Sequence, residues 1–141
     1  VCDLQDLPQA QWGCSGNVIP GADGQIFGDG IQNTNDILAS CYDIGIAAAL
    51  CASSTAQGYN DWFLPSKYAM EVLFLNRNEI YFSLIMNGGS FFDQQQYWSS
   101  TEDYGSSMAW AQNFNIGYGG NNPSYSMPKS SYLNVRAVRA F

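Results

Sequence analysis

The chain has 141 residues and a mass of 15.5 kDa, the size of one domain; 46% of its residues are hydrophobic and only 12% are charged. This composition excludes a disordered chain, and no apolar run approaches the roughly 20 residues that cross a bilayer. The sequence contains no histidine, which excludes Ser-His-Asp and Cys-His catalysis and histidine-ligated metals. We expect one domain over residues 1–141, with no membrane insertion, catalytic residue, metal ligand or cofactor.

Four cysteines, Cys2, Cys14, Cys41 and Cys51, lie in the first 51 residues. Their even number is typical of two disulfides in an exported protein, whereas the irregular spacing does not fit a zinc site. Three pairings are open, and we favour Cys2–Cys14 with Cys41–Cys51. The second pair needs a break in any helix between its members, because ten residues of straight helix span about 15 Å. Free thiols in a reducing compartment are the alternative.

Residues 21–33, GADGQIFGDGIQN, indicate a turn-rich loop. Its oxygen-bearing side chains can close Asx turns, or they can bind calcium, although the EF-hand spacing is missing. The side chains concerned are those of Asp23, Asp29, Asn33 and Asp36.

Two helices are expected after this loop. Thr34 or Asn35 can cap the first of them, and apolar residues follow at helical spacing. The alanines at 47–49, with Cys51, indicate a second, shorter helix.

A further helical region follows an extended segment at residues 58–65. Pro65 disfavours helix before it, and Ser66 is a suitable N-cap for a well-buried helix that starts at Lys67. Helical spacing then continues until Gly88-Gly89 ends it.

Beyond Gly89 the apolar period changes to two, which predicts strands at residues 97–100, 108–114 and 133–141. Residues 115–131 are rich in Gly, Asn, Ser and Tyr, so we expect a long exposed loop there. Two or three short helices followed by an antiparallel sheet predict an α+β domain.

Two further patterns have a structural and a functional interpretation. Trp62, Trp98 and Trp110 lie beside small or polar residues, so we expect core anchors, with sugar-stacking platforms as the alternative. Glu102 and Asp103 are adjacent at a strand end, where neighbouring side chains point to opposite faces. A turn or capping role is therefore expected rather than a catalytic carboxylate pair.

The net charge of -7 is unevenly distributed. Residues 1–65 carry seven acidic side chains and no basic one, whereas residues 105–141 carry three basic side chains and no acidic one. An anionic ligand would meet the C-terminal third, although a solubility surface explains the pattern equally well. Five basic residues without a basic stripe exclude general nucleic-acid binding. Period two puts Arg136 and Arg139 on opposite faces, so we expect at least one to be structural and only the other to serve a ligand.

A series of motifs runs along nearly the whole chain. They are Trp12-Gly13-Cys14, Gly21-Ala22-Asp23-Gly24, Asn33-Thr34, DWFLPSK at 61–67, YWSSTE at 97–102, Ala109-Trp110 and VRAVRAF at 135–141. With them the chain resembles the C-terminal domain family of the Legionella collagen-like adhesin, related to C-type-lectin-like ligand-binding domains. Residues 1–11 replace the Gly-rich segment that precedes Trp-Gly-Cys in that family.

The resemblance implies a C-type-lectin-like fold and a non-enzymatic adhesin head at the bacterial cell surface, acting in host attachment and biofilms. Such heads often follow a collagen-like stalk, and a Gly-X-Y stalk trimerises, so a homotrimer is implied. The implied ligand is a sulfated polysaccharide, such as a glycosaminoglycan, or another host surface glycan. Basic side chains, multiplied by trimerisation, would hold it. The candidates are Lys67, Arg77, Lys129, Arg136 and Arg139.

A second hypothesis rests on neutral residues whose composition is typical of antibody loops. The chain also resembles retroelement-diversified lectin-like proteins, which implies a variable domain that binds a protein receptor. The candidates are Asn113, Asn115, Tyr118, Asn121, Asn122, Ser124, Tyr125, Ser126 and Tyr132. Calcium-bridged sugar binding is not expected, because Asn122-Pro123-Ser124 is the nearest approach to the required ligand run. An ordinary polar loop accounts for the same residues.

Overall fold

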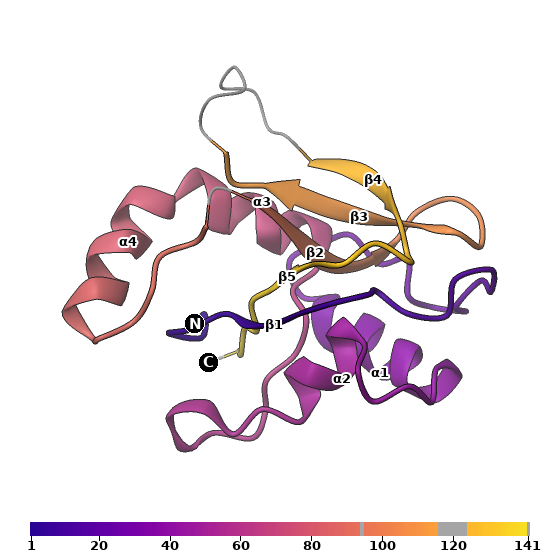
Figure 1. The fold of residues 1–141 in the computed structure, drawn as a ribbon, viewed down its shortest axis with the longest axis horizontal. Coiled ribbons are helices and arrows are strands. Elements are labelled where there is room, and N and C mark those ends of the chain that lie inside the picture. Colours follow the sequence, from indigo (N-terminus) through magenta and orange to yellow (C-terminus); the bar gives the residue numbers. More distant parts are fainter. Residues whose placement is uncertain (94, 116–123, 141) are drawn as a thin grey trace.

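The computed structural model describes residues 1–93, 95–115 and 124–140 (Figure 1). The elements in chain order are β1 (Leu7–Ala10), α1 (Gly30–Ser40), α2 (Ala47–Ala52), the 3-10 turn η1 (Ala56–Gly58), α3 (Lys67–Leu75), α4 (Arg77–Met86), β2 (Gln96–Glu102), β3 (Met108–Asn113), β4 (Ser124–Pro128) and β5 (Leu133–Val135). The predicted α+β class is confirmed. In these ranges no helix is long and apolar enough to cross a bilayer.

The five strands form one sheet in the order β1-β5-β2-β3-β4. Neighbouring strands are antiparallel except β2 and β5, which run parallel where Tyr97 faces Asn134. The prediction of an antiparallel sheet is therefore wrong at this pair. Residues 129–132 lead from β4, at one edge of the sheet, to β5, which lies between β1 and β2, so β4 and β5 do not form a hairpin.

Several element boundaries differ from the expected ones. The helix α1 begins at Gly30, ahead of the predicted cap at Thr34. The Thr34 hydroxyl instead donates to the Gly30 carbonyl (2.7 Å) and accepts from the Leu64 amide (3.1 Å), so it ties α1 to the segment before α3. The predicted loop at 115–131 contains β4, which pairs with the preceding strand β3, and β1 was not predicted, because its partner β5 lies at the other end of the sequence.

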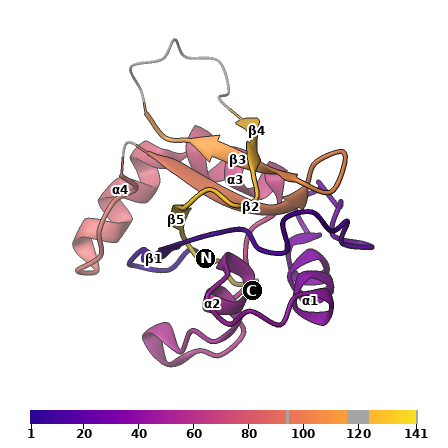
Figure 2. The ribbon, with the colours of Figure 1, turned by 45° about the vertical axis from the view of Figure 1, so that its right-hand side comes forward.

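The sheet lies between two hydrophobic cores. Trp98 on β2 packs on the side of α1 and α2, whereas its neighbour Tyr97 packs on the side of α3 and α4 (Figures 1 and 2). Trp62 and Trp98 are buried core anchors, as expected. Trp110 is only partly buried, and the Lys67 ammonium lies 3.4 Å from the centre of its ring.

The two ends of the described chain lie side by side (Figure 2). The Val1 amine donates to the Arg139 carbonyl (3.0 Å), and the Arg139 amide donates to the Val1 carbonyl (2.9 Å). The predicted cap of α3 is confirmed, since the Ser66 hydroxyl accepts from the Ala69 amide at 3.4 Å.

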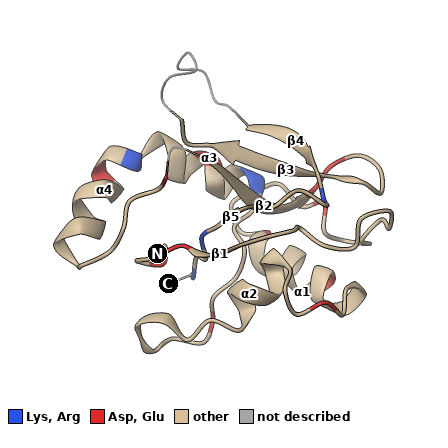
Figure 3. Ribbon diagram, in the orientation of Figure 1, with Lys and Arg blue, Asp and Glu red and all other residues tan. Residues whose placement is uncertain are grey.

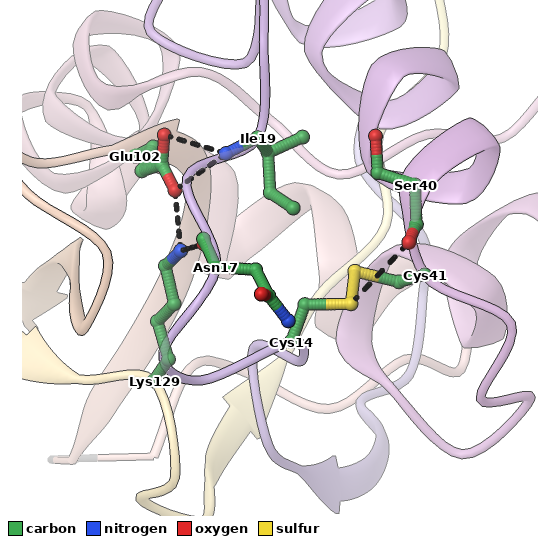
Figure 4. The surroundings of a disulfide bond; sticks show 7 residues. All are labelled: Cys14, Asn17, Ile19, Ser40, Cys41, Glu102 and Lys129. Atoms are coloured by element: carbon green, nitrogen blue, oxygen red, sulfur yellow. Dashed lines mark hydrogen bonds and ion pairs between the residues drawn. A yellow bond between two sulfur atoms is a disulfide. The ribbon is translucent and has the colours of Figure 1, made fainter.

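One disulfide joins Cys14 to Cys41 (Figure 4), so the pairing that we favoured is wrong. The other two cysteines are free thiols: Cys2 packs against the α3/α4 core, whereas Cys51 is buried in the α1/α2 core. Burial raises the pKa of the Cys51 thiol and keeps it protonated. Closing a loop of 27 residues stabilises the fold by about 3 kcal/mol, and such a bond is typical of an oxidising compartment.

The residue before Cys14 is a glycine because a side chain there would clash. Gly13 has a φ of 109°, and a Cβ there would lie 2.7 Å from the Ile46 side chain. A larger residue would therefore strain the turn and push the disulfide away from α2.

Candidate functional site

Lys129 forms part of the core rather than of a binding surface. Its fully buried ammonium pairs with Glu102 and donates to the Asn17 carbonyl at 2.7 Å (Figure 4). Both Glu102 oxygens also accept from the Ile19 amide, at 3.0 and 3.1 Å. This clamp joins β2, the β4–β5 connection and the loop after the disulfide-bonded Cys14. It corrects the expectation that Lys129 contacts a ligand, because a charge inside the protein cannot reach one.

Arg136 is fully buried as well. Its Nε lies 2.5 Å from an Asp6 carboxylate oxygen, and Nη1 donates to the Asp3 carbonyl at 2.9 Å and the Ser90 carbonyl at 3.1 Å. Burial raises the pKa of Asp6, while the neighbouring guanidinium opposes that shift. The expected structural arginine is therefore Arg136, and its predicted role in ligand binding is corrected.

The other three basic residues reach solvent but are already engaged. Arg139 makes two 2.8 Å hydrogen bonds to Asp61, which lower the pKa of that carboxyl group. Lys67 lies over Trp110, and Arg77 donates to the Phe74 carbonyl at 2.7 Å. The basic residues do not gather on one face: Lys67 begins α3, Arg77 begins α4, and Arg139 lies beside the chain ends (Figure 3).

A polar groove of about 420 Å³ lies at one end of the sheet, where β2 begins, β3 ends and β5 begins. Its volume is within the usual range for ligand pockets. Six of its eight described lining residues are amides, and none of the eight is charged. The lining residues are Gln9, Gln95, Gln96, Asn113, Asn115, Tyr132, Leu133 and Asn134.

The strand register brings these amides together. Gln96 on β2 lies opposite Asn113 on β3, and Asn134 on β5 lies opposite the residue that follows Gln96. Gln9 reaches over from β1 and donates to the Asn134 Oδ1 at 2.8 Å. The Asn113 Oδ1 accepts from the Asn115 amide at 2.8 Å and so holds the turn that ends β3. Four strands therefore contribute to one groove.

One buried donor in the groove is unpaired. Asn134 is only 6% exposed, and its Nδ2 has no hydrogen-bond partner among the described residues. An unsatisfied buried polar group costs about 1–3 kcal/mol, and such groups are rare in native structures. Because Asn134 lines the groove, an acceptor atom of a ligand there can complete this hydrogen bond.

Aromatic hydroxyl groups flank the amides. Tyr132 is 66% exposed and lines the groove. Tyr125 on β4 is hydrogen-bonded to Gln96, and its partial burial raises the pKa of its hydroxyl. Tyr125 is not among the described lining residues of the groove, so its predicted contact with a ligand stays a prediction.

The structure gathers only part of the predicted neutral surface. Asn113, Asn115 and Tyr132 meet in the groove, and Ser124, Tyr125 and Ser126 form part of β4. The predicted residues Tyr118, Asn121 and Asn122 lie outside the described residues. Sequence reasoning missed five lining residues, because nothing local shows that the ends of β1, β2 and β5 meet. These five are Gln9, Gln95, Gln96, Leu133 and Asn134.

The acidic loop forms turns. The Asp29 carboxylate accepts from the Ile26 amide at 2.9 Å, and Asn33 bonds both the amide and the carbonyl of Gly24. These bonds reach back three residues from Asp29 and nine from Asn33, so both side chains brace the loop without forming Asx turns, which bond to the amide two residues further on. The described ranges contain no group of three or more His, Cys, Asp or Glu side chains placed to hold a metal.

Compared with known proteins, the chain matches no family model, and no curated protein matches its sequence. The resemblance to the adhesin family and the C-type-lectin-like identity of the fold stay predictions.

Proposed function

We propose that this chain is a non-catalytic recognition domain that acts outside the cell and binds its partner through neutral hydrogen-bonding side chains. One contrast supports the proposal: each of the five basic side chains has at least one partner inside the protein, although the Arg77 Nε itself is unpaired, whereas the groove holds a buried amide donor, the Asn134 Nδ2, that is unpaired within the described ranges. The disulfide supports an oxidising compartment. The bacterial cell surface and the homotrimer are further parts of the proposal, implied by the resemblance.

Of the two partners expected from the sequence, a receptor recognised through neutral residues is favoured over a sulfated polysaccharide. Sulfate groups need basic donors, and burial leaves Lys67, Arg77 and Arg139 as the candidates. Arg139 would have to give up two hydrogen bonds to Asp61, and Lys67 its contact with Trp110. Trimerisation would bring three copies of these residues together, but it would not free them from their present partners.

The test compares two variants in binding to heparin and to an array of cell-surface receptor ectodomains. Gln95→Trp fills the groove from an exposed position, and Gln32→Trp, on the exposed side of α1, is its matched control. We expect receptor binding to be lost only in Gln95→Trp. Binding should also change little from about 0.1 M to about 1 M NaCl, although the Debye length falls from about 10 Å to about 3 Å.

The charge-neutral triple variant Lys67→Gln/Arg77→Gln/Arg139→Gln tests the other partner. We expect it to bind as the unmodified domain does, with heparin binding weak in both. Strong heparin binding that disappears in the triple variant and at high salt would overturn the proposal in favour of the sulfated polysaccharide.

A further inference from the structure

The chemistry of the groove narrows the class of ligand. We propose that the groove binds one neutral sugar unit of a glycan, an inference that rests on the proposed function and names the ligand of the same site. Its basis is the combination of an uncharged lining, an unpaired buried donor and an exposed tyrosine.

The uncharged lining argues against an ionic ligand. A sulfate, carboxylate or ammonium group in the groove would lose water without gaining an opposite charge from the eight described lining residues. Asp6 and Arg136 neutralise one another inside the protein and do not line the groove. The ligand that this surface favours is therefore polar and neutral.

The amides favour hydroxyl groups over a peptide. Each primary amide presents a donor and an acceptor side by side, and each hydroxyl group is both donor and acceptor. Neighbouring hydroxyls of a sugar ring can pair with the amides of residues such as Gln96 and Asn113, and one sugar oxygen can accept from the Asn134 Nδ2. A peptide would need an apolar anchor, since protein interfaces depend on buried aromatic or aliphatic contacts. Within the described lining, the side chains that could serve as such an anchor are Leu133, which is only 8% exposed, and the single ring of Tyr132 at the rim.

Tyr132 supplies the remaining contact. Its ring is largely exposed at the rim, and its position precedes Leu133 and Asn134 at the start of β5. An exposed aromatic ring can cover the C–H face of a sugar while its hydroxyl remains in water. The amides below it are held in advance, because Gln9 bonds Asn134 and Tyr125 bonds Gln96. Little conformational entropy is then lost when a sugar binds.

The experiment is an NMR titration of the ¹⁵N-labelled domain with methyl glycosides of neutral hexoses and of N-acetylhexosamines, up to tens of millimolar. We expect saturable shifts confined to the groove, including the side-chain NH₂ of Asn134. The affinity should not change between about 0.1 M and about 1 M NaCl, because no charges are paired.

Two variants and a control locate the binding. Tyr132→Ala removes an exposed ring, and Asn134→Leu removes the unpaired donor while nearly keeping the side-chain shape. Each should weaken sugar binding by about three- to tenfold, the worth of one net contact. Asn78→Ala removes an exposed amide on α4 and should leave the affinity unchanged. The amide spectrum of each variant reports whether the fold is kept.

The outcomes separate this inference from the proposed function. If no glycoside shifts the groove while Gln95→Trp still abolishes receptor binding, the sugar ligand is overturned and the recognition function stands. Binding of an unglycosylated protein in the groove leads to the same conclusion. If glycosides bind equally well to Tyr132→Ala and Asn134→Leu, the groove is not their site. If glycosides occupy the groove but Gln95→Trp leaves receptor binding intact, the proposed function fails and the sugar site stands.

Discussion

Two buried clamps, one formed by Lys129 with Glu102 and one by Arg136 with Asp6, are polar, and so is the groove around Asn134. Their hydrogen bonding differs. In the clamps, charged side chains are buried and their partners come from several segments of the chain. In the groove, neutral amides line an open volume, and one buried donor is unpaired among the described atoms. Charge holds this fold together, whereas neutral groups are left for a ligand.

The energetic cost of burial explains the difference. A buried charge without a partner is so costly that Lys129 and Arg136 must be paired in the folded protein. An unpaired neutral amide costs far less, so a marginally stable domain can keep one at a binding site. Basic residues in a sequence are therefore weak indicators of a binding surface when acidic partners are within reach.

The largest effect is expected from Lys129→Met. The change leaves the Glu102 carboxylate buried without its cation, so the free energy of unfolding should fall by about 3–5 kcal/mol. Urea denaturation measures this loss. Lys67→Met is the control, and its partly exposed contact with Trp110 should be worth about 1 kcal/mol. An effect of Lys129→Met no larger than that of Lys67→Met would contradict the structural role of the clamp.

A smaller effect of opposite sign is expected from Asn134→Leu. Removing an unpaired buried NH₂ should raise the free energy of unfolding by up to about 1 kcal/mol, while sugar binding weakens. The exposed Gln9 loses its partner but can bond to water. The same urea measurement serves here. A marked loss of stability would mean that the amide serves the fold and not a ligand.

The smallest effect concerns the exposed Asp61–Arg139 pair. Its hydrogen bond lowers the pKa of Asp61 in the folded state below the usual value of 3.8. The pair therefore stabilises the fold at pH values above 3.8. The stabilisation is lost as the pH falls through the lowered pKa. Asp61→Asn should therefore be slightly less stable than the unmodified domain at about pH 7 and equally stable at acidic pH. Thermal unfolding at both pH values tests this, and an equal difference at both would contradict it.

Much of the helical part of the fold could be predicted, because its signals are local. The cap at Ser66, the helix from Lys67 and the stop at Gly88-Gly89 all appear in the structure within short stretches of sequence. The strands β2 and β3 were also predicted from their period of two. In contrast, β1 shows no alternation of buried and exposed residues, and β4 lies in a segment whose Gly, Asn, Ser and Tyr content predicted a loop.

The candidate site could be predicted only in part. Local composition identified Asn113, Asn115 and Tyr132 as a neutral polar surface. Nothing local shows that Gln9 and Asn134 join them, because their meeting depends on the insertion of β5 between β1 and β2. The burial of Lys129 and the choice of Cys41 as the partner of Cys14 depend in the same way on distant segments.

The sequence by itself determined the α+β class, the positions of the main helices and the absence of histidine chemistry. These follow from periodicity, capping and composition, which act over a few neighbouring residues. Tertiary structure alone decided which cysteines pair, which basic residues are buried and where the amides gather. Each of those outcomes depends on contacts between residues far apart in the chain, and burial then determines whether a polar group stabilises the fold or stays available to a ligand.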